Sequence, residues 1–370
     1  MKMTKLEELA IKLKRVRTLM EEKKLDAIWL KRQDDFAWLS CGGQNYIGWG
    51  ELGNCGLLVT QSDVFAITNN IEYPRMRDEE HLEDLGFKLL YDTYLNNKFE
   101  GDTIRGLVPN GKIGTDYSNG YGQDISGDIK VLRLSLTESE QDRLRKVGQM
   151  ASLALEEACA TMRVGETELE CVKRIADRLY DCGMEFTSLM AAADDRLYNY
   201  RHAIPTANAI KERLQVGGNM RKWGLTVCMT RYVNFVPVTV ELRKQYRLNQ
   251  EIDLTLMTNT IPGRKYLDPF EKARALYEKN GIGKEFTLHH VGGPIGYANR
   301  DYRVDYSVGG TIQDNQAFCW NPSITGTKSE DTILVHKDGF EFITRPYIFP
   351  TVDIEFEGKT YKRADILEKC

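Results

Sequence analysis

The sequence predicts two domains, an α/β domain over residues 1–133 and an α+β domain over residues 134–370. In the first domain, short apolar runs alternate with helical stretches, which is the pattern of a sheet covered by helices. In the second, two helix N-terminal signals precede a region that is punctuated by glycine and rich in β-branched and aromatic residues. A chain of 370 residues is long enough to bury a core in each domain.

The first domain is expected to open with a helix, because the apolar residues from Leu6 to Leu19 keep to one broad face while Lys and Glu fill the other. Three short apolar runs with strand composition follow: AIWL at 27–30, GLLVT at 56–60 and DVFAITN at 63–69. The next segment, NIEYPRMRDEEHLEDLG, has the composition of a helix. This alternation favours a sheet with helices.

Two capping boxes open the second domain. Thr137 with Glu140 precedes a long amphipathic stretch, and Thr167 with Glu170 precedes a second helix that Gly183 ends. Beyond them, three segments have the composition of antiparallel strands: GLTVCMTRYVNFVPVTVEL, QAFCWNPSI and DTILVHKDGFEFIT. Between the first and second of these lies a further expected helix, LDPFEKARALYEKNG.

Charge and cysteine content narrow the class of function. The formal net charge of -4 gives no field that would recruit nucleic acid or an anionic membrane surface, so we expect a small-molecule substrate. The N-terminus lacks the apolar core of a signal peptide, which predicts a cytoplasmic protein. The eight cysteines are dispersed without a CxxC pair and are expected to be reduced thiols.

Residues 289–301, HHVGGPIGYANRD, hold two of the five histidines of the chain. The segment has the form of a catalytic metal-binding segment without its ligands. Two other stretches share this character: WGLTVCMTRYV at 223–233 and WNPSITGTKSEDTILV at 320–335. Together the three resemble the GYxxDxTRT, HxxGHGIGxxxHE and xEPGxY…RxEDTxxV motifs of the creatinase, prolidase and aminopeptidase P family. The resemblance covers nearly the whole chain and implies a C-terminal pita-bread domain preceded by a creatinase-type N-terminal domain.

The resemblance also shows which metal ligands this chain lacks. Family members that act as peptidases hold two divalent cations with two Asp, one His and two Glu. Carried over, these positions fall on Gly217, Cys228, Gly293, Asn321 and Glu330. One carboxylate and one thiol do not supply the ligands that two hard cations need, so we expect neither a dinuclear metal centre nor another cofactor. A single metal held by Cys228, His290 and Glu330 stays an open alternative.

His202, in RLYNYRHAIPT, matches the family histidine that lies over the substrate and is not a metal ligand. Creatinase, a metal-free member, is thought to use that histidine as its general base, and it carries an Arg and Glu pair where this chain has Arg300 and Asp301. A histidine has a pKa suited to taking a proton from water near neutral pH. Glu330 is a candidate to hold a guanidinium, and Arg300 to hold a carboxylate. Their structural interpretation is a surface pair of Glu330 with Lys328 and a surface ion pair of Arg300 with Asp301.

The remaining candidates have a structural and a functional interpretation each. His289 and His290 are adjacent, so on a strand they face opposite sides, and we favour His290 as the one in the pocket. Cys228 is either a small apolar filler or a nucleophile. Asn321 is expected to replace a ligand carboxylate as a neutral hydrogen-bonding group.

The segment DDFAWLSCGGQNYIGWG in the first domain gathers Phe36, Trp38, Tyr46 and Trp49. Its structural interpretation is a strand and turn with core aromatic residues. The resemblance implies a different role, because in creatinase-like homodimers this part of one subunit covers the partner's active site. Trp38 and Tyr46 are accordingly candidate substrate-binding residues.

The leading hypothesis is a metal-independent hydrolase that cleaves a C–N bond in a small amidino, ureido or amide compound, with His202 as general base. Two alternatives stay open: a non-catalytic protein that binds a ligand or peptide in the same pocket, and an Xaa-Pro peptidase with a rearranged metal site.

Overall fold

The structure is a computed structural model that describes residues 3–48, 50–118 and 121–370. It divides into two compact units, Met1–Glu140 and Gln141–Cys370. The division falls inside a helix that begins at Glu138, whereas the sequence predicted a boundary after residue 133. Among the described residues, no helix combines the length and apolar character that crossing a membrane requires.

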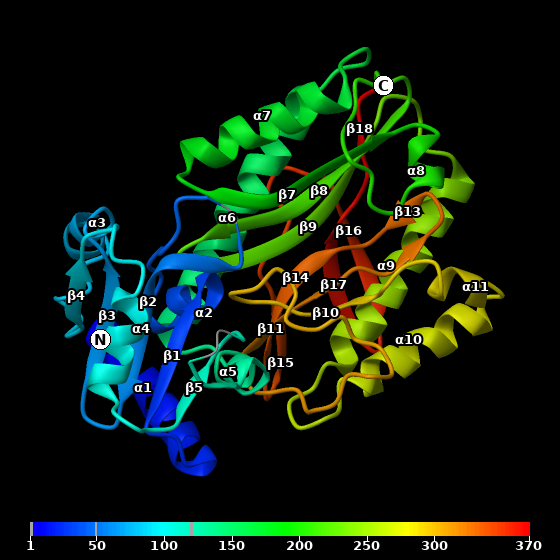
Figure 1. Ribbon diagram of the computed structural model, residues 1–370. Helices are drawn as coiled ribbons and strands as arrows, with labels where there is room; N and C mark the ends of the chain where they lie inside the picture. Colours follow the sequence, from blue (N-terminus) through cyan, green and yellow to red (C-terminus); the bar gives the residue numbers. More distant parts are fainter. Residues whose placement is uncertain (1–2, 49, 119–120) are drawn as a thin grey trace. The chain divides into compact units, whose positions relative to one another are not determined.

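The described residues of the first unit form a six-stranded sheet in the order β4-β3-β2-β1-β5-β6, with five helices (Figure 1). β1 pairs antiparallel with β2 and parallel with β5. The elements are α1 (Lys5–Lys23), β1 (Ala27–Arg32), α2 (Gln33–Leu39), β2 (Leu52–Thr60), β3 (Val64–Asn69), α3 (Tyr73–Asp78), β4 (Lys88–Asp92), α4 (Phe99–Leu107), β5 (Ile113–Thr115), β6 (Gln123–Asp124) and α5 (Ser126–Leu132). The first helix and the three predicted strands are present.

Two local predictions in this unit are wrong. The segment DDFAWLS lies mainly in helix α2 and not in a strand. Asp34 and Asp35 stand in its first turn, where carboxylates interact favourably with the helix dipole, and Arg133 pairs with both at 2.8 and 2.6 Å. Of the helical stretch expected over residues 70–86, only α3 forms as an α-helix.

The second unit contains two four-stranded sheets, β18-β9-β8-β7 and β10-β11-β14-β15, and two short hairpins, β12-β13 and β16-β17. Its helices are α6 (Glu138–Thr161), α7 (Glu168–Asp181), α8 (Arg196–Asn199), α9 (Val240–Asn259), α10 (Leu267–Lys279) and α11 (Gly283–Phe286). Its strands are β7 (Glu185–Ala193), β8 (Arg213–Lys222), β9 (Leu225–Asn234), β10 (Gly292–Pro294), β11 (Gln316–Trp320), β12 (Ser323–Ile324), β13 (Thr327–Lys328), β14 (Asp331–His336), β15 (Gly339–Phe342), β16 (Thr351–Phe356), β17 (Lys359–Ala364) and β18 (Leu367–Glu368). The predicted α+β class is therefore confirmed.

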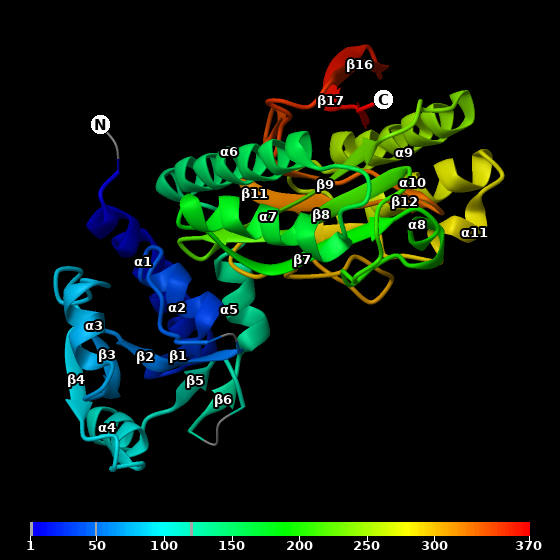
Figure 2. The ribbon, with the colours of Figure 1, turned by 90° about the horizontal axis from the view of Figure 1, so that it is seen from above.

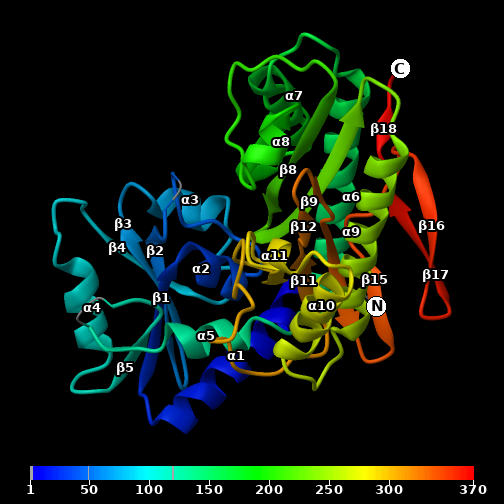
Figure 3. The same cartoon turned by 90° about the vertical axis from the view of Figure 1, so that its right-hand side faces the viewer.

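Helices cover the outer faces of these sheets. α6 and α7 lie along the sheet that contains β7, β8 and β9 (Figure 2). α9 and α10 pack on each other and share an apolar cluster with β11 and β14 that includes Leu256, Phe270, Phe318 and Ile333. The β16–β17 hairpin lies beside α9, and its Ile354 joins the same cluster (Figure 3).

The capping boxes were predicted correctly, but α9 was not. Thr167 accepts from Glu170 N at 3.2 Å, and the Glu170 carboxylate accepts from Thr167 N at 2.7 Å. The residues VEL, which the sequence placed in a strand, open α9 behind the N-cap Thr239. The buried face of α9 carries polar residues such as Asn249 and Asp253, which hide its helical apolar period.

A buried ionic network joins helix α6 to the two large sheets. Arg231 on β9 contacts Glu156 on α6 at 3.1 Å and Asp331 on β14 at 3.0 Å, and all three side chains are at most 4% exposed. The second carboxylate oxygen of Glu156 accepts three backbone N–H groups, from residues 347–349. Every charge in this network therefore has partners, as burial requires.

Replacing Arg231 with methionine is expected to lower the free energy of unfolding by about 3–5 kcal/mol, because it leaves the buried Glu156 carboxylate without its cation and removes one of the two cations that contact Asp331. Urea denaturation followed by circular dichroism measures the change. Arg243→Met serves as the control, since Arg243 pairs with Asp365 and Glu368 while 47% exposed, and a loss of at most about 1 kcal/mol is expected there. Equal losses in the two variants would contradict the role given to the network.

Candidate functional site

Strands from both sheets of the second unit bring the predicted motif residues together. Cys228 lies on β9, and the Thr332 hydroxyl on β14 accepts from its backbone N at 2.8 Å and donates to its carbonyl at 2.9 Å. Thr332 on β14 pairs with Cys319 on the neighbouring strand β11. Glu330 immediately precedes β14. As a result, the side-chain ligand atoms of Cys228, Cys319 and Glu330 lie within 4.8 Å of one another, and all three residues are buried.

The Glu330 carboxylate is held by three neighbours. Its Oε2 accepts from Thr230 Oγ1 at 2.6 Å and lies 2.8 Å from the ammonium nitrogen of Lys328, while Asn321 Nδ2 lies 3.4 Å from Oε1. Burial alone would raise the pKa of Glu330, but the Lys328 ammonium and the Thr230 hydroxyl outweigh it and lower that pKa to about 2. Glu330 is therefore an anion at neutral pH. Its pair with Lys328 is buried, whereas the structural interpretation of the sequence placed it at the surface.

Arg300 contacts the strands that lie beside Glu330 and Cys319. Its Nη1 donates to the carbonyl of Gly293 at 3.1 Å and to the carbonyl of Cys319. These two residues are directly paired between β10 and β11, so the guanidinium lies against the strand pair. Asp301 is 6% exposed, and its backbone N donates to the Pro294 carbonyl at 3.0 Å. Neither residue is part of a plain surface ion pair.

Three histidines form a second cluster, defined by His202, His289 and His290. The Nε2 atoms of His202 and His289 lie 3.0 Å apart, and the rings of His289 and His290 stack at 4.5 Å between centroids. The sequence favoured His290 alone as the histidine facing the pocket, but both members of the adjacent pair approach His202. They do so because they lie just before β10, outside any regular strand, so strand alternation does not apply.

The histidine cluster is neutral at physiological pH. Partial burial lowers the pKa of His202, although the residue is exposed on one side, and the positive charge of Lys328 adds to this effect. Burial and the neighbouring His290 lower the pKa of His289 to about 2, and burial with Arg300 lowers that of His290 to about 4. The free imidazole form of each ring is thus the dominant one, and it is the form that accepts a proton or binds a metal.

The residues at the family's ligand positions do not fit a dinuclear metal centre. A Cβ added to Gly217 would lie 2.4 Å from the carbonyl oxygen of Met229, and one added to Gly293 would lie 2.3 Å from that of Tyr302. Neither position has space for a ligand side chain. Of the carried-over positions, Glu330 alone supplies a carboxylate, and Lys328 already compensates it. Two hard divalent cations need many more oxygen or imidazole ligands than this.

Sequence reasoning missed three residues of the site. Lys328, Thr230 and Cys319 all contact Glu330. Lys328 was recognised only as a possible surface partner of Glu330. The sequence around Lys328 gave no signal of its burial, because the strands that enclose it are distant in the chain. Cys319 gave no signal of its own, because a cysteine in an apolar strand is usually a small filler.

The two aromatic residues of the first unit that were predicted to bind substrate have different environments in the structure. Trp38 is fully buried in α2, with the Lys12 ammonium 5.9 Å from its ring centroid, so it offers no surface to a substrate or a partner subunit. The prediction of a binding role for Trp38 is therefore wrong, because its ring belongs to the core. Tyr46 is partly exposed, and its role stays a prediction. Trp49 lies outside the described residues.

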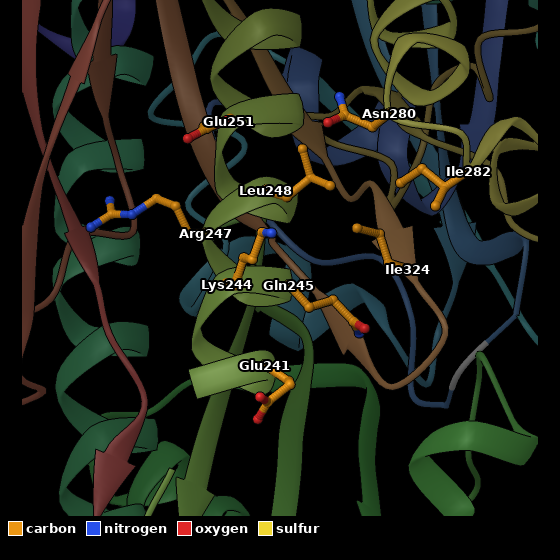
Figure 4. Close-up of a pocket in the computed structure, with 9 residues that line it drawn as sticks. All are labelled: Glu241, Lys244, Gln245, Arg247, Leu248, Glu251, Asn280, Ile282 and Ile324. Carbon is orange, nitrogen blue, oxygen red and sulfur yellow. The ribbon is translucent and has the colours of Figure 1, made fainter. Parts of the chain in front are cut away.

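A separate hollow of about 440 Å³ lies on the outer side of α9 (Figure 4). Leu248, Ile282 and Ile324 form its apolar part, while the Arg247 side chain extends away from them. The residues that line it include none of the predicted site residues. This hollow is therefore separate from the motif residues.

The two sheets, their covering helices and the motif positions define a pita-bread fold. Residues 142–337 match the model of metallopeptidase family M24, which is more than half of the chain. The chain therefore belongs to the M24 family. An uncharacterized peptidase of Staphylococcus aureus strain MW2 is 25% identical over 237 residues, which span 61% of this chain and 66% of that protein.

Solved structures share this fold over nearly the whole chain. The Xaa-Pro dipeptidase from Bacillus anthracis matches with a TM-score of 0.76 at 18% identity, covering 98% of this chain and 100% of that one. The prolidase from Pyrococcus horikoshii OT3 has the same TM-score at 16% identity, with 91% and 98% covered. The N-terminal domain of the FACT complex subunit SPT16 from chickpea has a TM-score of 0.71 at 11% identity, with 93% and 97% covered. These likenesses establish the fold, and the homodimer and cytoplasmic location stay predictions.

The histidine cluster predicts that stability depends on pH. The pKa values of about 4 for His290 and about 2 for His289 lie below the ordinary value of 6.5. Between these values the unfolded chain binds more protons than the folded one, so the free energy of unfolding is expected to fall as pH falls below 6.5. His290→Gln should reduce this slope by up to about 1.4 kcal/mol per pH unit, because it removes one proton difference.

Urea denaturation at intervals between about pH 5 and about pH 6.5 measures the slope in a range above the pKa of most carboxylates. His81→Gln is the control, because His81 is 60% exposed in the first unit and should leave the slope unchanged. The same slope in His290→Gln and the unaltered protein would show that the cluster is not the source.

Proposed function

We propose that this chain is a metal-independent hydrolase that cleaves a C–N bond in a small amidino, ureido or amide compound, with His202 as general base. The observation that carries the proposal is the state of His202. Its ring is exposed, neutral at physiological pH and 3.0 Å from a second neutral imidazole. A neutral, accessible histidine is the group best suited to take a proton from an attacking water.

His289 holds the His202 ring and determines which nitrogen of His202 is free to act as the base. One of the two facing Nε2 atoms carries the hydrogen of the His202–His289 contact, since each ring nitrogen is either a donor or an acceptor. In the proposed reaction, His202 accepts a proton from water as the oxygen attacks the carbon of the C–N bond. The same proton then passes to the departing nitrogen, so His202 returns to its neutral state.

The charged groups around the cluster orient the substrate. Lys328, Arg300 and Arg303 all act on the histidines from nearby, against the single carboxylate of Glu330. This excess of positive charge favours a substrate with a carboxylate or another anionic group. Because Lys328 and Thr230 already hold Glu330, a guanidinium would have to compete with them for it, so amide and ureido compounds fit the site better.

A second candidate function comes from the same three histidines. Their ligand nitrogens lie within 4.8 Å of one another, and three histidines with one open position are a known ligand set for catalytic zinc. Such a centre would make this chain a peptidase or amidase with a rearranged single-metal site. The positive charges of Lys328, Arg300 and Arg303 weigh against a dication there, which is why it is the second candidate.

His202→Ala is expected to lower kcat/KM by about 10²–10⁴-fold, the usual contribution of a general base. Activity is measured on a panel of guanidino, ureido, amide and Xaa-Pro compounds, before and after exhaustive chelation. The matched control is His81→Ala, which removes an exposed histidine in the first unit and should leave the rate unchanged.

Under the leading proposal, activity survives chelation. Activity that is lost on chelation and restored by Zn²⁺ would instead establish the second candidate. Unchanged activity in His202→Ala would contradict both, because both place His202 at the reacting centre.

A further inference from the structure

The Lys328–Glu330 pair lies at the one family ligand position that keeps its carboxylate. Lys328 Nζ is 2.8 Å from Glu330 Oε2, and both side chains are 5% exposed. A carboxylate buried this deeply requires a compensating cation. In metal-binding members of the family a divalent ion fills that need, whereas here an ammonium does.

Two thiols complete a ligand set around the same carboxylate. The sulfur atoms of Cys228 and Cys319 and a carboxylate oxygen of Glu330 all lie within 4.8 Å of one another. In a tetrahedral zinc site with Zn–S bonds of about 2.3 Å, two sulfur ligands are about 3.8 Å apart. The three side chains are therefore close enough to bind one Zn²⁺ after small adjustments.

The ammonium of Lys328 opposes such binding in two ways. It neutralises the Glu330 carboxylate by contact with Oε2, while Oε1 lies 3.8 Å from the Cys319 sulfur, and it places a positive charge beside the position of a dication. Arg300, whose guanidinium donates to the carbonyl of Cys319, adds a second positive charge. Charges this close together in a buried site interact strongly because little water screens them.

We propose that the Lys328 ammonium is the resident cation of this centre and that it keeps a divalent metal from binding to Cys228, Cys319 and Glu330. The loss of the family's ligands removed the dinuclear site, and Lys328 closes the single-metal site that the remaining side chains would otherwise form. This inference does not depend on the proposed hydrolase activity. It concerns what occupies the centre, and metal binding tests it directly.

The test compares zinc binding by the intact chain and by Lys328→Ala, which removes the ammonium and leaves space beside Glu330. After equilibrium dialysis against Zn²⁺ under reducing conditions, Lys328→Ala is expected to retain about one more equivalent of zinc than the unaltered protein. Lys328→Arg keeps a cation and should show no gain. Lys328→Ala combined with Cys319→Ser should lose the gain, because one of the three ligands is then missing.

Co²⁺, used in place of Zn²⁺ as a spectroscopic probe, identifies the ligands of the metal site that Lys328→Ala is expected to gain. A thiolate-to-Co²⁺ charge-transfer band is expected in Lys328→Ala and absent from Lys328→Arg, which distinguishes this site from the histidine cluster. If Lys328→Ala folds poorly without metal, thermal unfolding with and without Zn²⁺ replaces dialysis, and a zinc-dependent rise in Tm is expected only in that variant.

Equal zinc binding with and without Lys328 would overturn the proposal. It would also be overturned if Lys328→Ala gained zinc that Cys319→Ser did not remove, since the metal would then lie elsewhere.

Discussion

Asp331 and Glu330 are neighbours in the chain, and the placement of the whole site depends on the network behind the first of them. Asp331 lies 3.0 Å from Arg231 and 3.1 Å from Arg363, and Arg363 in turn lies 2.7 Å from Asp253. Through these contacts, α9, β9, β14 and β17 share one buried set of charges. Because the Asp331 carboxylate is fixed by these contacts, the backbone beside it is fixed as well. The adjacent residue, Glu330, is thereby held with its side chain on the other side of the chain. The contacts of Asp331 therefore help to place Glu330.

The same principle explains why the site tolerates so much substitution. The scaffold of buried charges lies beneath the strands, while the chemistry-bearing side chains extend above them. Cys228 and Asn321 can therefore differ from the ligand residues of the family motif without loss of the fold, since the groups that hold the strands are elsewhere. Fold and function are carried by different faces of the same few strands.

The sequence predicted the fold class and the members of the site better than it predicted their environment. Local signals were sufficient where they were strong: the Thr167–Glu170 capping box marked a helix correctly, and the motif order indicated the family. They failed for α9, whose buried polar face has no clear apolar period, and for the buried Lys328. The burial of a lysine depends on strands that are distant in sequence, so composition near Lys328 does not reveal it. His289 and His290 show the same limit, because strand alternation predicts nothing for residues outside a strand.

The two glycines at former ligand positions have a consequence for how such a protein changes over time. At Gly217 and Gly293 the neighbouring backbone occupies the volume that a side chain would need. A single reversion to aspartate or histidine would meet a carbonyl oxygen before it met a metal, and it would weaken the fold without restoring a function. Regaining the dinuclear centre would take several changes at once, because more than one of its ligand positions lacks space for a side chain. The packing of the strands around these two glycines therefore makes the loss of the dinuclear centre difficult to reverse.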